Sequence, residues 1–211
     1  MDLNILRWID FTFHSNTFMN EIWKFITSTC DVACIWVVLC CVLVNFKSTK
    51  KIALIMALSM GVNCLIVEVG LKNIFMRTRP FAIENDFLVF LESIGYPPPY
   101  SSSFPSGHAS TSIAVAMTLF LYNKKWGTPA VIWAFLVALS RAYLCVHFPS
   151  DIIAGLMIGI IVANLVYTYS MAFIDKYNKH MYGIIKLTPM LTGEDFKNHK
   201  QHLKKSSCKT L

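Results

Sequence analysis

The longest apolar stretch of the sequence runs from Ile152 to Ile174 and reads IIAGLMIGIIVANLVYTYSMAFI. It holds 23 residues and no charge, and a helix of about 20 apolar residues is long enough to cross a bilayer. The whole chain of 211 residues is 55% hydrophobic and only 15% charged, whereas a water-soluble domain typically carries about 25% charged residues. The sequence therefore predicts an integral membrane protein.

Further apolar stretches give the predicted fold. Together with 151–174 they make five predicted spans, and the other four are residues 30–47, 52–71, 106–122 and 129–146. Residues 1–27 have apolar side chains at helical spacing, interrupted by charges, which predicts an amphipathic helix at the membrane interface or one merging into the first span. We expect an all-α membrane bundle of five to six transmembrane helices. The expected division is an N-terminal helix (1–27), a membrane domain (28–175) and a basic tail (176–211).

The positive charges give the predicted orientation. The chain has 19 Lys+Arg against 12 Asp+Glu, a net charge of +7. Lysines occur in the loops 47–51 and 123–128 and in the tail, and segments rich in Lys and Arg stay in the cytoplasm. The loops 72–105 and 147–150 are then predicted to face outward. The basic residues form no groove-sized set interleaved with aromatic residues, so we expect no nucleic-acid partner.

Three cations in the outer loop break this charge rule, which suggests that they bind an anion there. Lys72 and Arg79 are seven residues apart, or two helical turns, so they can share a helix face. Arginine and lysine both suit phosphate oxygens, although a pair of cations can also simply anchor a helix at the membrane edge. Arg77 is either an accessory anion contact or a solvated charge.

A helix is predicted to start at Ser106 and Gly107, directly after Pro105. Free backbone N–H groups at a helix start point toward anions, and a glycine lets an anion approach closely. Ser106 alternatively serves only as the N-cap of that helix. His108 follows at once, so an ionisable ring stands beside the predicted anion site.

A third group of polar residues interrupts or follows the fourth predicted span. Arg141 lies within an apolar stretch, where a charge is costly unless it faces a polar cavity or a partner such as a phosphate. A structural salt bridge to Glu68 is the alternative. His147 and Asp151 are four residues apart, so the carboxylate can hold one ring nitrogen and leave the other basic. A purely structural His–Asp pair is the competing interpretation.

Taken together, these groups suit phosphoryl transfer through a covalent phosphohistidine. One histidine attacks phosphorus and the other protonates the leaving oxygen, while cations and amides stabilise the charge on the equatorial oxygens. Asp151 is the only carboxylate in the three groups, so a two-metal site lacks ligands. We therefore expect neither a metal nor another cofactor.

The pattern K-x6-RP, PSGH and SR-x5-H-x3-D, from Lys72 to Asp151, resembles the three-part signature of the type 2 phosphatidic acid phosphatase (PAP2) superfamily. The resemblance implies a helical core shared with the vanadium haloperoxidases. It implies that His147 is the nucleophile, that Asp151 orients it and that His108 is the general acid. The phosphate-binding residues that it implies are Lys72, Arg79, Ser106, Gly107 and Arg141.

The resemblance also implies a membrane phosphatase acting on a lipid phosphate or diphosphate at the outer face. It favours undecaprenyl diphosphate, followed by phosphatidylglycerophosphate or phosphatidate and then a lipid A phosphate. Transfer of the phosphate to another acceptor is an alternative, and a non-catalytic lipid-binding protein is a weaker one. We expect the chain in a bacterial plasma membrane, as part of the cell envelope, with its tail in the cytoplasm. The apolar segment 87–91 either lines a lipid entrance or is a loop helix packed on the bundle.

Overall fold

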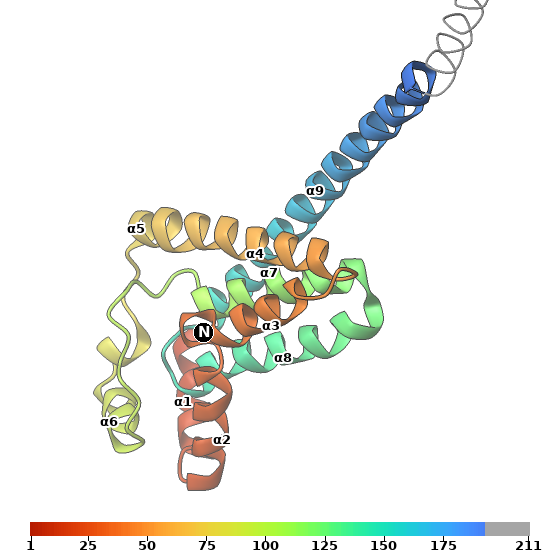
Figure 1. Ribbon diagram of the computed structural model, residues 1–211. Coiled ribbons are helices and arrows are strands. Elements are labelled where there is room, and N and C mark those ends of the chain that lie inside the picture. Colours follow the sequence, from red (N-terminus) through yellow and green to blue (C-terminus); the bar gives the residue numbers. More distant parts are fainter. Residues whose placement is uncertain (193–211) are drawn as a thin grey trace, which may run out of the picture. The chain divides into compact units, whose positions relative to one another are not determined.

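The computed structural model describes residues 1–192, and in this range every regular element is a helix (Figure 1). Nine are α-helices, and three are short 3-10 or π segments labelled η. In chain order they are α1 (Asp2–Phe13), α2 (Thr17–Ser28), η1 (Asp31–Ala33), α3 (Cys34–Val44), α4 (Lys50–Cys64), η2 (Leu65–Leu71), α5 (Lys72–Phe75), η3 (Pro80–Ala82), α6 (Asn85–Ser93), α7 (Gly107–Tyr122), α8 (Lys124–Tyr143) and α9 (Pro149–Thr192). The all-α fold class is thereby confirmed for the described part of the chain.

The described chain falls into two compact units, and the predicted division into three parts stays a prediction. The first unit is Met1–Tyr167, and the second begins at Thr168 within α9. The predicted N-terminal helix at 1–27 is two helices, because Asn16 accepts a hydrogen bond from the backbone N–H of Met19 and starts α2 anew. The predicted basic tail, 176–211, falls in the second unit and lies largely outside the described residues.

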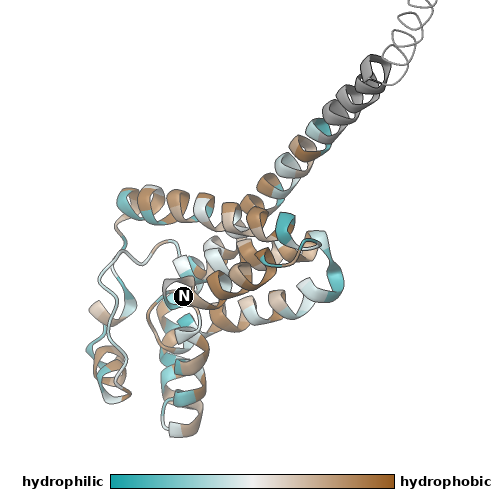
Figure 2. Ribbon diagram, in the orientation of Figure 1, coloured by the Kyte–Doolittle hydropathy of each residue, from teal (hydrophilic) through white to brown (hydrophobic). Residues whose placement is uncertain are grey.

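Among the described residues, two helices are long and apolar enough to cross a membrane, Lys50–Ala82 and Pro149–Tyr177. They contain the predicted spans 52–71 and 151–174, and Figure 2 shows apolar residues along much of α4. The other three predicted spans correspond to α3, α7 and α8, with 11, 16 and 20 residues. The predicted span 30–47 is shortened because Ala33 has a left-handed backbone (φ 55°), so α3 begins only at Cys34. The number of transmembrane helices stays a prediction.

The core of the first unit is formed around α7, which packs against α8 and α4. The buried residues of α7 are mostly small, among them Ala109, Ser110 and Ala114. The start of α9 also lies close to α7, because a Cβ atom on Gly159 would come within 2.3 Å of the Ser110 carbonyl oxygen. This close packing joins the first turns of α7 and α9, where Ser106 N–H donates to the Asp151 carbonyl oxygen at 3.1 Å.

The long segment predicted as the outer loop, 72–105, contains helix α6. Phe87, Phe90 and Leu91 of α6 are buried, and they belong to clusters that include Tyr143 at the end of α8 and Leu6 of α1. Their spacing of three and four residues places them on one helix face. The segment 87–91 is therefore a helix packed on the bundle, as one of the two sequence interpretations proposed.

The π segment η2 joins α4 to α5 and directly precedes Lys72. A π turn inserts one extra residue into a helix, and such bulges are frequent at functional sites. It therefore changes which face of the long helix carries Glu68 and Lys72.

Candidate active site

His147 lies in the turn between α8 and α9, and its side chain is only 2% exposed. Cys145, two residues after the end of α8, is in a left-handed conformation (φ 51°), and the backbone N–H of His147 bonds to the Arg141 carbonyl oxygen. The ring Nδ1 is 2.7 Å from the Ser103 carbonyl oxygen. Because a carbonyl only accepts, Nδ1 carries the proton. The Nε2 atom is 3.2 Å from Nη1 of Arg79 and accepts from it.

The surroundings of His147 keep the ring neutral. Burial lowers its pKa well below the usual 6.5, the positive charges of Arg79 and Arg141 lower it further, and Asp151 raises it. The net effect is a strong lowering. An unprotonated Nε2 with a lone pair is the form in which a histidine is a nucleophile.

Asp151 is fully buried and is held by three donors. Its Oδ1 accepts from Arg77 Nη1 at 2.5 Å, and its Oδ2 accepts from Ser103 Oγ at 2.5 Å and from Phe148 N–H at 3.0 Å. The distance from Oδ2 to His147 Nδ1 is 3.7 Å. The expected direct hydrogen bond between Asp151 and His147 is thus replaced by a link through Ser103, whose hydroxyl holds the carboxylate and whose carbonyl holds the ring.

Arg79 is buried, and backbone oxygen atoms fix its guanidinium. Its Nε donates to Ser101 O at 2.6 Å, Nη1 to Val146 O at 2.9 Å and Nη2 to Ser102 O at 3.3 Å. These acceptors are neutral, so they orient the positive charge without neutralising it. Arg79 therefore presents a fixed cation next to the Nε2 atom of His147.

Lys72 joins the same cluster through a serine. Its Nζ donates to Glu68 at 2.8 Å and to Ser101 Oγ at 3.2 Å, while Arg79 Nη2 lies 3.1 Å from that hydroxyl. Lys72 and Arg79 thus converge, but they do not share a helix face as their spacing predicts, because α5 ends at Phe75 and the backbone of Arg79 is extended. The Glu68 carboxylate lies against Gly107, because a Cβ atom there would come within 2.1 Å of Oε1. A carboxylate therefore occupies the space between Lys72 and the start of α7.

Arg141 is buried without an anionic partner among the described residues. Its Nη1 donates to Thr27 Oγ1 at 2.5 Å and to the Tyr96 hydroxyl at 2.8 Å, and its Nε has no hydrogen-bond partner. The alternative salt bridge to Glu68 is not formed, since Glu68 pairs with Lys72. A buried, unpaired cation is costly unless an anion joins it, so Arg141 has positive charge that no described side chain neutralises.

The start of α7 has the N-cap that one of the two sequence interpretations predicts, and anion binding there stays a prediction. Ser106 is buried and acts as the N-cap, because its Oγ accepts from Ala109 N–H at 3.5 Å. His108, the second residue of α7, has its ring 23% exposed and its Nε2 3.0 Å from Asp31 Oδ1. The side chains of His108 and Arg141 therefore bond to groups other than the His147 ring, whereas Arg79 and Ser103 contact that ring directly.

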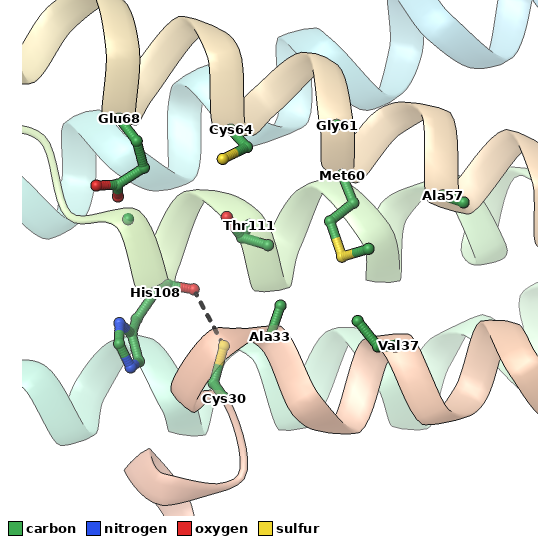
Figure 3. A pocket seen from close by; sticks show the side chains of 11 residues that line it. Cys30, Ala33, Val37, Ala57, Met60, Gly61, Cys64, Glu68, His108 and Thr111 are labelled. Carbon is green, nitrogen blue, oxygen red and sulfur yellow. Dashed lines mark hydrogen bonds between the residues drawn. The ribbon is translucent and has the colours of Figure 1, made fainter.

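A mainly apolar cavity of about 480 Å³ opens beside His108. Glu68 and His108 lie at one end of it and Val37 and Ala57 at the other (Figure 3). A second cavity of about 510 Å³ is lined by the cations Lys72, Arg77 and Arg79 and by several hydroxyl groups. Lys72 and the neighbouring Glu68 thus separate an apolar chamber from a polar one.

Sequence reasoning missed three residues that hold this site. Ser101 and Ser103 act partly through backbone carbonyl groups, which leave no signal in a sequence. Arg77 was weighed only as an anion contact or a solvated charge, but it is paired with Asp151. In the described part of the chain, no three His, Cys, Asp or Glu side chains gather as metal ligands would.

A helical protein with a cationic site around a buried neutral histidine is the class that this fold and geometry define. Residues 49–175 match the PAP2 superfamily, which is more than half of the chain. The chain therefore belongs to the PAP2 superfamily, and that membership places it among the phosphoric monoester hydrolases.

Named relatives support this assignment. The chain is 26% identical over 200 residues to the undecaprenyl-diphosphatase BcrC of Bacillus subtilis, covering 93% of this chain and 100% of the relative. It is 36% identical over 126 residues to an undecaprenyl-diphosphatase of Sulfolobus acidocaldarius, covering 59% of this chain and 58% of the relative. The crystal structure of Aquifex aeolicus LpxE superposes with a TM-score of 0.67 at 23% identity, covering 80% of this chain and 95% of that one. This last likeness shows the fold.

Proposed function

We propose that this PAP2 protein hydrolyses a lipid phosphate or diphosphate at the outer face of the membrane, through a phosphohistidine on His147. Undecaprenyl diphosphate is the favoured substrate. The observation that carries the proposal is the pair of contacts on the His147 ring. Ser103 holds the Nδ1 proton, and Nε2 keeps its lone pair beside the Arg79 guanidinium.

In the first step, Nε2 of His147 attacks the terminal phosphorus, a P–N bond forms, and the P–O bond to the leaving group breaks. The leaving group is the lipid monophosphate when the substrate is a diphosphate, and the lipid alcohol when it is a monophosphate. His108 gives its proton to the departing oxygen as a general acid. In the second step, water attacks the phosphohistidine, His108 takes a proton from the water, and inorganic phosphate leaves with His147 restored. During both steps Arg79 turns its donor from the ring to a phosphate oxygen.

Four further groups stabilise the negative charge on the equatorial oxygens. Lys72 supplies a point charge, and Arg141 supplies a buried cation whose Nε has no other partner. The Ser106 hydroxyl and the Gly107 amide stand at the start of α7, where the helix dipole favours an anion. The Glu68 carboxylate lies against Gly107, so it must move away from the start of α7 when the substrate phosphate binds there.

The apolar cavity supports a lipid as the leaving group. His108, the proposed acid, lies at one end of this cavity, and small or apolar side chains of α3 and α4 line the rest. The oxygen that His108 protonates belongs to the leaving group that carries the lipid chain. It is the bridging oxygen of a lipid diphosphate or the ester oxygen of a lipid monophosphate. An isoprenoid or acyl chain bound in the cavity would therefore place the leaving oxygen near the acid.

The arrangement of helix ends supports one common side for the site. Asp151 and Ser106 stand at the starts of α9 and α7, Arg141 stands near the end of α8, and Lys72 begins α5 directly after η2. Because the basic loops 47–51 and 123–128 lie at the opposite helix ends, the positive-inside rule favours an outward-facing site with the tail in the cytoplasm.

The test is phosphate release by purified protein in detergent with EDTA present. Undecaprenyl diphosphate, phosphatidylglycerophosphate, phosphatidate and lipid A are offered side by side, with folded His147→Ala protein as the blank. Release from one lipid well above the blank is expected, together with an acid-labile phosphate label on the wild-type protein. Strong release by the His147→Ala variant would remove His147 as nucleophile. Release only when an alcohol acceptor is present would favour phosphotransfer instead.

A further inference from the structure

Arg77 connects the buried Asp151 to the beginning of the chain. Its Nη1 donates to Asp151 Oδ1 at 2.5 Å and to Ser150 Oγ at 2.8 Å, and its Nη2 donates to Asp2 Oδ2 at 3.2 Å. The guanidinium carbon lies 4.1 Å from the centre of the Phe148 ring. Ser150 also donates to Asp2. Arg77 is thus bound on both terminal nitrogens and stacked on one face.

The sequence left two interpretations open for Arg77, an accessory anion contact and a solvated charge. The contacts in the structure give Arg77 a further role, because its two terminal nitrogens bond to the carboxylates of Asp2 and Asp151. Within the described residues, Arg77 is the only Lys or Arg side chain in a salt bridge with Asp151.

We propose that Arg77 is a positioning residue, which fixes the Asp151 carboxylate and balances its charge so that His147 keeps an unprotonated Nε2. This inference rests on the proposed role of His147 as nucleophile. Arg77 acts through Asp151 and Ser103, because neither the ring of His147 nor the space beside Nε2 is among its contacts. Arg77 lies outside the three-part signature that the sequence displays.

The charges around His147 explain why this balance matters. The ring faces the cations Arg79 and Arg141 and the anion Asp151, and Asp151 in turn faces Arg77. Without Arg77, the buried carboxylate 3.7 Å from Nδ1 would have no cation of its own. An unopposed carboxylate favours the protonated imidazolium, and an imidazolium has no lone pair with which to attack phosphorus.

The geometric part of the argument concerns the shared serine. The Asp151 carboxylate uses Oδ2 for Ser103 Oγ and Phe148 N–H, and it uses Oδ1 for Arg77. If Oδ1 loses its donor, the carboxylate can rotate and release Ser103. Because the Ser103 carbonyl holds the His147 ring, the orientation of Nε2 then becomes less well defined.

The experiment compares the pH dependence of kcat/KM for the wild type, Arg77→Gln and Arg77→Lys. In Arg77→Gln we expect kcat/KM to fall by about 10- to 100-fold and the acid limb to move to higher pH by about one unit. Lysine keeps the positive charge, so Arg77→Lys should retain the limb of the wild type and recover part of kcat. Arg7→Gln is the matched control, because Arg7 is an exposed arginine paired with Glu84.

A purely structural Arg77 gives a different result. Arg77→Gln would then lower the thermal midpoint and the amount of active protein, but the folded fraction would keep the acid limb of the wild type. That outcome overturns the proposal. If Arg77→Gln does not fold, Asp2→Asn provides the second variant. Asp2→Asn removes the competing carboxylate, so Arg77 interacts with Asp151 alone. The acid limb of kcat/KM should then stay where it is in the wild type or move to lower pH, and a move to higher pH contradicts the proposal.

A second measurement separates this inference from the proposed phosphatase activity. The His147 ring is titrated by NMR in histidine-labelled protein, with His147→Ala used for assignment. We expect the His147 pKa to be higher in Arg77→Gln than in the wild type, and an unchanged value overturns the inference. A wild-type protein that hydrolyses none of the four lipids would contradict the proposed function, while the titration would still decide the role of Arg77.

Discussion

The His147 ring takes its orientation from the backbone of Ser103, since its Nδ1 lies 2.7 Å from the Ser103 carbonyl oxygen but 3.7 Å from Asp151 Oδ2. A backbone carbonyl cannot be protonated or removed by a side-chain substitution. The proton on Nδ1 is therefore fixed by the chain itself, and the carboxylate mainly supplies charge and holds the serine.

Replacing Ser103 should therefore cost less than replacing the histidine. Ser103→Ala removes the hydroxyl that donates to Asp151 and leaves the carbonyl that holds the ring. We expect kcat/KM to fall by about tenfold, the value of one hydrogen bond to a charged group, with KM nearly unchanged. Ser102→Ala is the control, because its hydroxyl makes only a long bond to Arg77 O at 3.5 Å. A loss as large as that of His147→Ala would show that the carbonyl alone does not hold the ring.

Activity should persist at acidic pH. Burial lowers the pKa of His147 well below 6.5, so the nucleophile stays unprotonated as the pH drops through that value. The acid limb of kcat/KM, measured with a substrate whose ionisation is known, should then lie below pH 6.5. The same lowered pKa reduces the free energy of unfolding at acidic pH. Below pH 6.5 the histidine is protonated in the unfolded chain but stays neutral in the folded protein, so protonation favours unfolding. An acid limb above pH 7 would contradict this environment for His147.

A larger side chain in the apolar cavity should weaken the binding of long-chain lipid substrates and leave short, soluble phosphate substrates unaffected. A Cβ atom on Gly61 meets nothing within 4 Å, and Gly61 lines the cavity. Gly61→Leu should raise KM for a long-chain lipid phosphate by about tenfold, because bulk displaces part of the chain. Turnover of a short, water-soluble phosphate monoester should be unchanged. Leu58→Phe is the matched control, since Leu58 is an exposed residue of the same helix. Equal effects on both substrates would place the lipid chain elsewhere.

Arg141 should show opposite effects on stability and on activity. Arg141→Met removes a buried cation that has no anionic partner among the described residues, and such a replacement is often neutral or stabilising. We expect an unchanged or higher thermal midpoint, together with a loss in kcat/KM of about 100-fold. Inhibition by vanadate, a phosphate mimic, should weaken in parallel. A large drop in the midpoint without weaker vanadate inhibition would make Arg141 a structural residue.

The signature residues were accessible to sequence reasoning because each lies at or near the end of an apolar helix. Lys72 and Arg79, for example, were paired by spacing, and the structure joins them through Ser101. Ser101 itself could not be predicted, because its position depends on the path of the loop before α7. Arg77 was missed for a similar reason, since its partners Asp151 and Asp2 lie 74 and 75 residues away along the chain.

Helix boundaries were predicted less well than site residues. Asn16 is a good N-cap and was a visible sign that residues 1–27 form two helices. Phe87, Phe90 and Leu91 have helical spacing within the segment predicted as a loop, and the structure places them in α6. The left-handed conformation of Ala33, in contrast, has no counterpart in residue type, so the late start of α3 was not predictable.

The π segment between Leu65 and Leu71 sets the rotation of the preceding helix relative to Lys72. The exact number of residues in this segment therefore matters for the site. Each residue advances an α-helix by about 100° and 1.5 Å. Deleting one residue from this segment would therefore change the length of the apolar helix very little, but it would turn every residue before it by more than a quarter of a revolution relative to Lys72. A natural or engineered one-residue gap here should give a protein that inserts normally and cannot hold its anion. A sequence alignment that ignores such a one-residue gap would pair Lys72 with the wrong position of the related chain.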